Sequence, residues 1–483
     1  MEKETQKSFV RSLSLLDATL LVTGSMIGSG IFIVSADIAR NVGSAGYLLL
    51  VWFASGLLTL FAALSYGELA GMMPNAGGQY VYIREAYNKF TAFLYGWTVF
   101  TVIQTGVIAA VAMAFATFTA QLFPFFDKTN VLFSIGTYSF STTQLLAIAS
   151  IFFLTYINSK GISYGKLIQM VFTSAKLIAL FGLIALGFFI GFNTDILSLN
   201  SIDFWEATQT TNSADVWSTT PLSGVSLLSA LGVAMIGSLF SSDAWNNVTF
   251  ISAEIKDPAK NLPRSLFLGT TIVTIIYILV NIVYLGIIPV KGVADGADVM
   301  SRGLQFATND RVGTAVAEIL LGSSASVVMA ILIMMSTFGC NNGLILSGAR
   351  VYYAMANDGL FFKNAGKLNS NGVPSNALYW QAVWASVLCL SGSYGALLDY
   401  TILAALAFYI ITISGIFILR KKQPNTPRPY KAIGYPIIPI VYCVVAFLIC
   451  INLIICKPEN ALPCLAIVFA GIPVYFLYKK YNN

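Results

Sequence analysis

The chain has 483 residues, of which 57% are hydrophobic and only 10% are charged, whereas a soluble globular domain carries about a quarter charged residues. Its formal net charge is +6, and it contains no histidine. This composition excludes an ordinary soluble enzyme, a disordered chain, a nucleic-acid-binding protein and any site that needs histidine. We expect a protein embedded in a lipid bilayer, with no cofactor and no bound metal.

Twelve apolar stretches follow one another along the chain. A membrane-crossing helix needs about 20 mostly apolar residues, and polar or turn-rich segments such as Pro74–Gly78 separate the stretches. The sequence therefore predicts an all-α membrane protein with twelve transmembrane helices. They lie near residues 15–39, 46–72, 90–121, 143–158, 164–192, 223–254, 262–288, 312–356, 375–391, 394–419, 434–456 and 460–478.

Basic residues predict how these helices are oriented. If the N-terminus is cytoplasmic, most of the 27 Lys and Arg residues fall in segments inside the cell, as the positive-inside rule requires. The tails 1–14 and 479–483 and the loop 420–433 are then cytoplasmic, and the loop 193–222 is extracellular. Short loops favour a multi-pass protein of the plasma membrane, specifically a bacterial inner membrane.

Gly- and Ser-rich segments interrupt the first and the sixth stretch, at Thr23–Phe32 and Met235–Asn246, and both contain Met-Ile-Gly-Ser. Such interruptions are tolerated in lipid only where they line a cavity. Paired interruptions in corresponding halves point to the binding site of an inverted-repeat transporter. We expect two repeats, 15–192 and 223–419, followed by two further helices in 434–478. The alternative is that these small residues only permit close helix packing.

Unwound helices expose backbone groups that suit one kind of ligand. The freed N–H groups at the start of a half-helix, where the dipole is positive, suit a carboxylate. The freed carbonyls at the opposite end suit an ammonium group. Two interrupted helices side by side therefore suit the head group of an α-amino acid.

Three ionisable residues within the apolar stretches are candidate functional groups, because charges at membrane depth are costly. Lys176 can alternate between charged and neutral forms, or it can snorkel or make a fixed structural hydrogen bond. Asp243 can pair with a cationic substrate group, or equally cap freed N–H groups. For Glu68 a structural ion pair is favoured over a proton site or a gate.

Five motifs resemble those of the amino acid–polyamine–organocation transporters, more narrowly the L-type amino acid transporter branch and its bacterial relatives. The first motif lies in the first helix, and the others follow the second, sixth and eighth helices or precede the eleventh. They are Gly28–Phe32, Tyr66–Ala70 with Pro74–Tyr82, Glu254–Pro263, Ala349–Gly359, and Arg428–Lys431 with Tyr435-Pro436.

The resemblance implies the leucine-transporter fold, a five-plus-five inverted repeat whose first and sixth helices unwind in mid-membrane. It implies that the substrate head group binds at Ile27, Gly28, Ser29, Gly30 and Ile31 of the first helix, and at Phe240, Ser241, Ser242, Asp243 and Asn246 of the sixth. Phe240 would also be the outer aromatic gate. Lys176 and Ser336 would take the place of a sodium ion between helices 1 and 8. Phe240 can instead be ordinary core, and Ser336 can bond only its own helix.

The chain also departs from this branch. Animal members carry a Cys between helices 3 and 4 that bonds a glycoprotein, but 122–142 contains none, so we expect no disulfide-linked heavy chain. Many animal members have Gly where Asp243 stands, which leaves neutral and cationic substrates open.

The leading function is sodium-independent transport of L-amino acids, with neutral ones expected first, by alternating access. Amino acid exchange, proton symport and cationic amino acid or polyamine antiport remain as alternatives. An enzyme is not expected. The side-chain pocket is left open, with Gln104, Asn341 and Thr401 as candidates.

Overall fold

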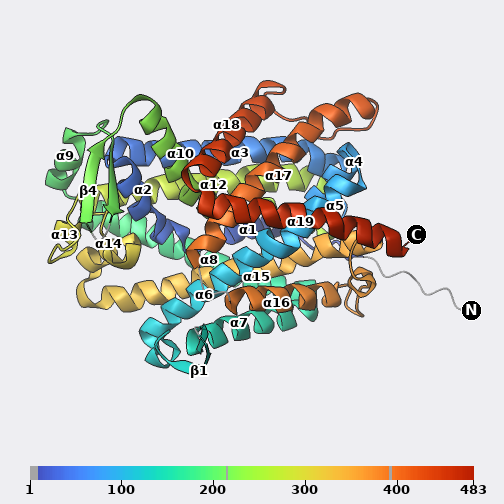
Figure 1. Cartoon of the computed structure of the whole chain (residues 1–483), viewed down its shortest axis with the longest axis horizontal. Helices are drawn as coiled ribbons and strands as arrows, with labels where there is room; N and C mark the ends of the chain where they lie inside the picture. The colour runs from blue at the N-terminus through green and yellow to red at the C-terminus, as the bar shows by residue number, and fades with distance from the viewer. Residues whose placement is uncertain (1–8, 137, 214–215, 391–393, 483) are drawn as a thin grey trace, which may run out of the picture.

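A computed structural model describes residues 9–136, 138–213, 216–390 and 394–482. Long helices run roughly along the long axis of the molecule, and α19, the last helix, ends at one end of it (Figure 1). The short elements α9, β4 and α13 gather at the opposite end. The predicted tails 1–14 and 479–483 lie partly outside the described residues.

The first interrupted helix comprises α1 (Leu15–Met26), a 3₁₀ turn (Gly30–Phe32) and α2 (Val34–Val42). The second comprises α10 (Gly224–Ser241) and α11 (Asn247–Phe250). The other long helices are α3 (Ala45–Met72), α5 and α6 (Lys89–Thr98 and Gln104–Leu122, joined by a π-helical turn), α7 (Thr142–Ser159), α8 (Ile162–Leu186), α12 (Pro258–Ile287), α15 (Ala325–Asn357), α16 (Ser375–Leu390), α17 (Tyr394–Lys422), α18 (Ile437–Cys456) and α19 (Pro458–Asn482).

Ten helices of the described residues are long and apolar enough to cross a membrane. The stretches predicted at 15–39 and 375–391 are also helical, but α1 has only 12 residues and α16 only 16. A mostly helical, multi-pass membrane protein is thus confirmed, whereas the number of twelve crossings stays a prediction.

Two details of the sequence prediction are wrong. The stretch 312–356 is not one helix, because it is divided into α14 (Val312–Leu321) and α15 around Gly322, whose φ of +62° ends α14. The chain is also not purely α-helical. Two antiparallel hairpins, β1–β2 (Val131–Ile135 and Tyr138–Ser141) and β3–β4 (Thr208–Ser213 and Val216–Pro221), lie in the predicted outer loops.

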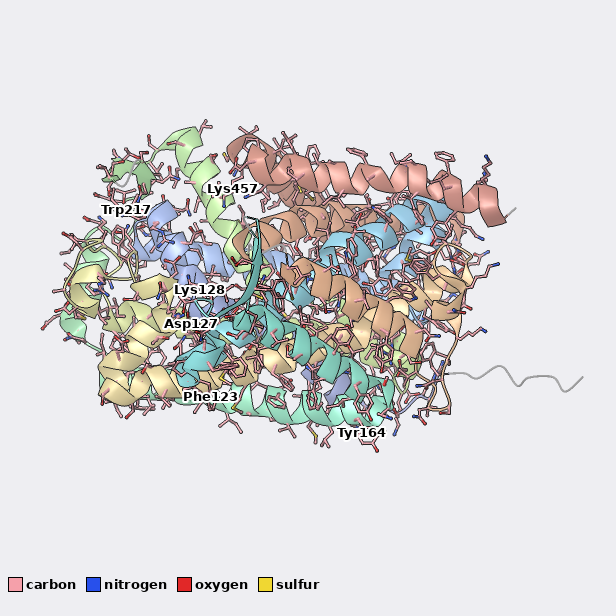
Figure 2. All side chains as sticks on the ribbon, turned by 60° about the horizontal axis from the view of Figure 1, so that its bottom comes forward. Phe123, Asp127, Lys128, Tyr164, Trp217 and Lys457 are labelled. Atoms are coloured by element: carbon pink, nitrogen blue, oxygen red, sulfur yellow. The ribbon has the colours of Figure 1, made fainter. Side chains whose placement is uncertain are left out.

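Apolar side chains cover both the inward-facing and the outward-facing sides of the long helices. In the interior, α12 packs against α3 and α1, and α15 packs against α6 and α8. On the outside, large apolar side chains remain exposed: Phe123 and Tyr164, which are 57% and 58% exposed, lie along the edge of the molecule (Figure 2). A surface of this kind suits contact with lipid rather than with water. This packing of the long helices holds the interrupted helices in place: α1 contacts α12, α8 and α15, and α10 contacts α2 and α3.

Candidate functional site

The first interruption begins where α1 ends at Met26. Ile27 takes an extended conformation, with φ −78° and ψ 98°, and regular helix resumes only at Val34. Four of the five predicted binding residues here, Ile27, Ser29, Gly30 and Ile31, are buried. The Gly28 N–H has no hydrogen bond to another described residue. The break therefore presents backbone groups away from bulk water.

Lys176 on α8 supplies donors to the carbonyls that this break frees. Its Nζ lies 2.6 Å from both the Gly24 O and the Ile27 O, and 3.3 Å from the Ser336 O on α15. The Ser336 Oγ donates to Ile27 O (3.2 Å) and to Gly28 O (2.9 Å). Lys176 is only 2% exposed, so snorkelling is wrong, as is the alternative that Ser336 bonds only its own helix.

The second interruption begins where α10 ends at Ser241. Ser242 leaves the helix with φ −100° and ψ 7°, and Ala244 has a φ of +64°, in the left-handed region that a non-glycine residue seldom adopts. The Asp243 Oδ1 accepts a 2.6 Å hydrogen bond from the Tyr409 hydroxyl. The Asn246 Nδ2 donates to the Gln79 Oε1 at 2.9 Å. Side chains from distant segments thus hold this turn.

The two interruptions touch each other. A Cβ added to Gly30 would lie 2.1 Å from the Ser241 Oγ, so only glycine allows this approach. The hydroxyl of Tyr277 on α12 donates to the Ser241 O (2.9 Å) and the Met26 O (3.3 Å), and so joins the ends of α10 and α1. The predicted gate Phe240 is partly buried and packs against the core. Ser242 is buried beside it.

A small cavity of about 20 Å³ lies beside the second interruption. A volume of this size holds about one water molecule. Asp243 and Asn246 line it from the interruption, and Gln79, Tyr95, Gln104 and Tyr409 line it from other elements. Apart from Asn247, its remaining walls are apolar, and they come from the second interruption, the π-helical turn, α6, α11, α15 and α17. Gln104 was a candidate pocket residue; Asn341 and Thr401 are buried but are not among the lining residues.

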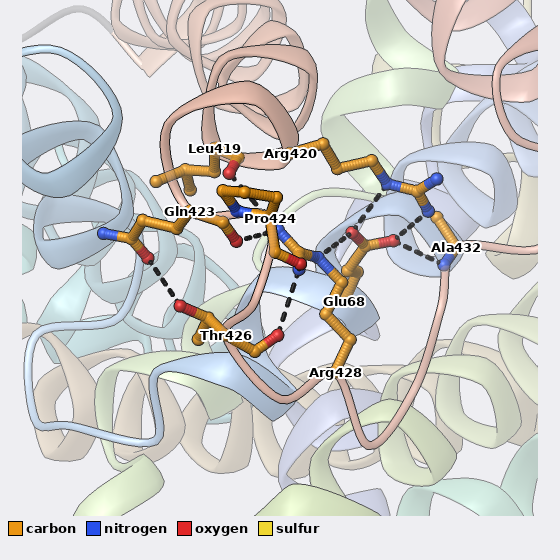
Figure 3. Close-up of polar contacts among 8 residues, drawn as sticks. All are labelled: Glu68, Leu419, Arg420, Gln423, Pro424, Thr426, Arg428 and Ala432. Carbon is orange, nitrogen blue, oxygen red and sulfur yellow. Dashed lines mark hydrogen bonds and ion pairs between the residues drawn. The ribbon is translucent and has the colours of Figure 1, made fainter.

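Glu68 lies in an ion-pair cluster rather than at the cavity. Its carboxylate accepts from Arg420 at 3.0 and 2.7 Å, from Arg428 at 3.3 Å and from the Ala432 N–H at 2.8 Å (Figure 3). Arg428 also donates to the Leu419 and Gln423 carbonyls. The cluster ties the end of α3 to the segment between α17 and α18. The predicted structural ion pair of Glu68 is thereby confirmed.

Sequence reasoning missed three residues that hold the site. Tyr277, Gln79 and Tyr409 are buried and join segments far apart in the chain. Tyr277 carried one usable signal, because a tyrosine deep in an apolar helix must find a partner for its hydroxyl. Gln79 and Tyr409 gave no sign of which partner they have.

The chain is similar to known amino acid transporters over most of its length. A family model described as "Amino acid permease" matches residues 13–477. The b(0,+)-type amino acid transporter 1 of Mus musculus is 27% identical over 477 residues, which are 98% of this chain and 89% of the relative. The large neutral amino acids transporter small subunit 2 of Mus musculus is 29% identical over 97% and 81%. The Asc-type amino acid transporter 1 of the same organism is 27% identical over 97% and 81%.

Proposed function

The chain belongs to the amino acid permease family, and from that premise we propose that it carries L-amino acids across a membrane by alternating access, without sodium. One observation supports transport without sodium. The Lys176 Nζ binds the Gly24, Ile27 and Ser336 carbonyls that a small cation would otherwise bind. Because a lysine ammonium supplies both the charge and the donors, no metal ion is needed to hold the first interruption to α15.

The substrate head group binds between the two interruptions. The backbone of residues 27–31 binds the carboxylate and the amine, and residues 240–243 with Asn246 complete the site. The N–H groups of 28–31 receive the carboxylate, because the Ile27 N–H already donates to the Thr23 O at 3.0 Å. The free Gly28 N–H and the contact between Gly30 and Ser241 support this placement. Phe240 closes the site from outside.

Twelve helices in two repeats, 15–192 and 223–419, followed by 434–478, form the transporter. The support is the pair of interruptions, one in each repeat. Both termini are cytoplasmic, which agrees with the excess of Lys and Arg at that end. The loop 193–222 is then extracellular, and the loop 420–433 is cytoplasmic. The membrane is the plasma membrane, which in a bacterium is the inner membrane. With no Cys in 122–142, the chain works without a disulfide-linked heavy chain.

The proposed mode is exchange of one amino acid for another. A fixed charge on Lys176 favours exchange, because the cation then stays on the protein throughout the cycle. Proton symport is the second candidate, and it requires Lys176 to release its proton during the cycle. The three carbonyl contacts of its Nζ favour the fixed charge, since all three stabilise the ammonium form.

Uptake of radiolabelled leucine into proteoliposomes in sodium-free buffer tests this function. Vesicles are preloaded with mixed amino acids or left empty, with and without an inward proton gradient. Uptake only into preloaded vesicles is the expected result and establishes exchange. Uptake into empty vesicles driven by protons, and lost in Lys176→Ala, would establish symport instead. Uptake that appears only when sodium is added would contradict the assignment of Lys176.

A further inference from the structure

Helix ends that are far apart in sequence meet at the proposed cytoplasmic end of the molecule. The Lys422 Nζ at the end of α17 donates to the Ala86 O at 2.8 Å, and Ala86 is the last residue of α4 (Gln79–Ala86). The next helix, α5, begins shortly afterwards at Lys89. The end of α17 therefore lies close to the start of α5.

The last turns of α19 lie against the same part of α5 (Figure 1). The ring centroids of Tyr475 on α19 and Phe90 on α5 are 5.0 Å apart, with the rings edge to face. Lys479 and Lys480 follow in the last turn of α19. Lysines from α5, α17 and α19 thus gather in one region.

We call these lysines the lysine patch: Lys89, Lys421, Lys422, Lys479 and Lys480. All of them are exposed. None forms an ion pair with a described residue. A cluster of one sign of charge produces a positive potential, and that potential attracts anions.

The carboxylates of the neighbouring segments are already paired with arginines. Arg84 on α4 pairs with Glu85 at 2.9 Å and with Asp358 at 2.8 Å. Glu68 pairs with Arg420 at 2.7 Å, at the end of α17. The fork of an arginine suits such fixed pairs, whereas lysine is a compact point charge on a flexible stem. The charge of the lysine patch is therefore left for a ligand from outside the chain.

Apolar side chains are exposed directly beside the lysine patch. Phe476 and Leu477 on α19 are both more than half exposed. Residues three and four apart lie on the same face of a helix, so Phe476 shares a face with Lys479 and Lys480. A ligand that carries both an anionic group and a hydrocarbon chain fits this combination, whereas a soluble anion would use only the lysines.

We propose that the lysine patch binds the headgroup of an anionic phospholipid in the cytoplasmic leaflet, with the acyl chains along Phe476 and Leu477. Basic clusters at the cytoplasmic ends of membrane helices attract such lipids. The phosphate accepts charge-assisted hydrogen bonds from lysines of α5, α17 and α19, and so joins three helix ends. Lysines that only orient a protein in the membrane need no common location, but these come from three distant segments. The inference goes beyond the proposed transport function and uses only the proposed orientation.

Native mass spectrometry of the purified protein in detergent tests this site. The probes are dioleoylphosphatidylglycerol and dioleoylphosphatidylcholine, which share their acyl chains and differ in headgroup charge. A lysine beside an anionic headgroup contributes up to about fivefold in affinity, so we expect phosphatidylglycerol to bind at least about tenfold more tightly. Equal binding of the two lipids would overturn the site. Displacement of phosphatidylglycerol by excess glycerol 3-phosphate would overturn the lipid in favour of a soluble phosphate.

Variants locate the site through the ratio of the two lipid affinities, which does not depend on how much folded protein each preparation holds. We expect a ratio near one when the whole lysine patch is changed, as Lys89→Gln, Lys421→Gln, Lys422→Gln, Lys479→Gln and Lys480→Gln together. If that variant does not fold, Lys479→Gln with Lys480→Gln should still lower the ratio about fivefold. An unchanged ratio in either variant would overturn the placement.

The matched control removes the same charge from exposed lysines in other segments of the proposed cytoplasmic side, as Lys160→Gln, Lys256→Gln, Lys260→Gln, Lys363→Gln and Lys367→Gln together. We expect it to keep the wild-type ratio. Equal losses in the two variants would mean that the whole surface attracts anionic lipid, and would overturn the lysine patch as a site. Because leucine uptake does not enter these measurements, a failure of the proposed transport function would leave them unaffected.

Discussion

The two interruptions differ in how their acceptors are satisfied. At the first, the Gly24 and Ile27 carbonyls receive an internal cation, since the Lys176 Nζ lies 2.6 Å from each. At the second, the Asp243 carboxylate receives a tyrosine hydroxyl but no Lys or Arg within the described residues. Both regions are buried and rich in acceptors, yet only one contains its own positive charge.

This difference indicates a division of labour. A site that carries its own cation is complete before a ligand arrives, so it can hold the fold and present the head-group site. The second region contains no such cation among the described residues. Under the proposed function, the same backbone geometry at the first interruption would bind the head group of every amino acid.

Removing the internal cation should have the largest effect. In Lys176→Met the side chain keeps its length but loses its donors, and buried carbonyls are left unpaired. We expect leucine uptake to fall at least about 30-fold, equivalent to about 2 kcal/mol. Initial rates in preloaded proteoliposomes measure it.

The control is Lys166→Met on the same helix. Lys166 pairs with Asp17 at 2.8 Å, but its side chain is 36% exposed, and such pairs contribute at most about 1 kcal/mol. Equal losses in the two variants would contradict the special role of Lys176.

Separating the two interruptions should have an intermediate effect. In Gly30→Ala the new Cβ would lie 2.1 Å from the Ser241 Oγ and 2.8 Å from its Cβ, so the two segments must move apart. We expect the affinity for leucine to fall about tenfold, measured by competition. Gly182→Ala on α8 is the matched control, because a Cβ there meets nothing within 4 Å. Wild-type affinity in Gly30→Ala would refute the close approach.

The smallest effect is expected from Ser336→Ala, which removes one hydroxyl donor but leaves Lys176 in place. A neutral hydrogen bond contributes about 1 kcal/mol, so uptake should fall about fivefold. The Ser336 carbonyl still accepts from Lys176 at 3.3 Å. A larger loss of uptake in Ser336→Ala than in Lys176→Met would contradict the account, because the Ser336 hydroxyl would then contribute more than the Lys176 ammonium.

Local signals in the sequence predicted the interruptions. Gly and Ser at 24–30 and 237–242 mark where regular helix ends, and the structure ends α1 at Met26 and α10 at Ser241. Gly322-Ser323-Ser324 is a similar Gly- and Ser-rich segment, but the prediction ran one helix through it and so missed the boundary between α14 and α15. Glycine is informative because its effect on the backbone is local.

The partners of the second interruption were not predictable in this way. Gln79 lies 167 positions before its partner Asn246, and Tyr409 lies 166 positions after its partner Asp243. Such contacts depend on how helices pack, and no period or spacing records them. The contacts of Lys176 and Ser336 were expected only through the resemblance to known transporters.

The most direct test is an experimental structure of the protein with bound L-leucine in sodium-containing buffer, at a resolution that shows the ligand. The account predicts the leucine carboxylate at the N–H groups of residues 28–31 and the Lys176 Nζ still bound to the Gly24 and Ile27 carbonyls. A carboxylate bound elsewhere, or a sodium ion at those carbonyls, would contradict it.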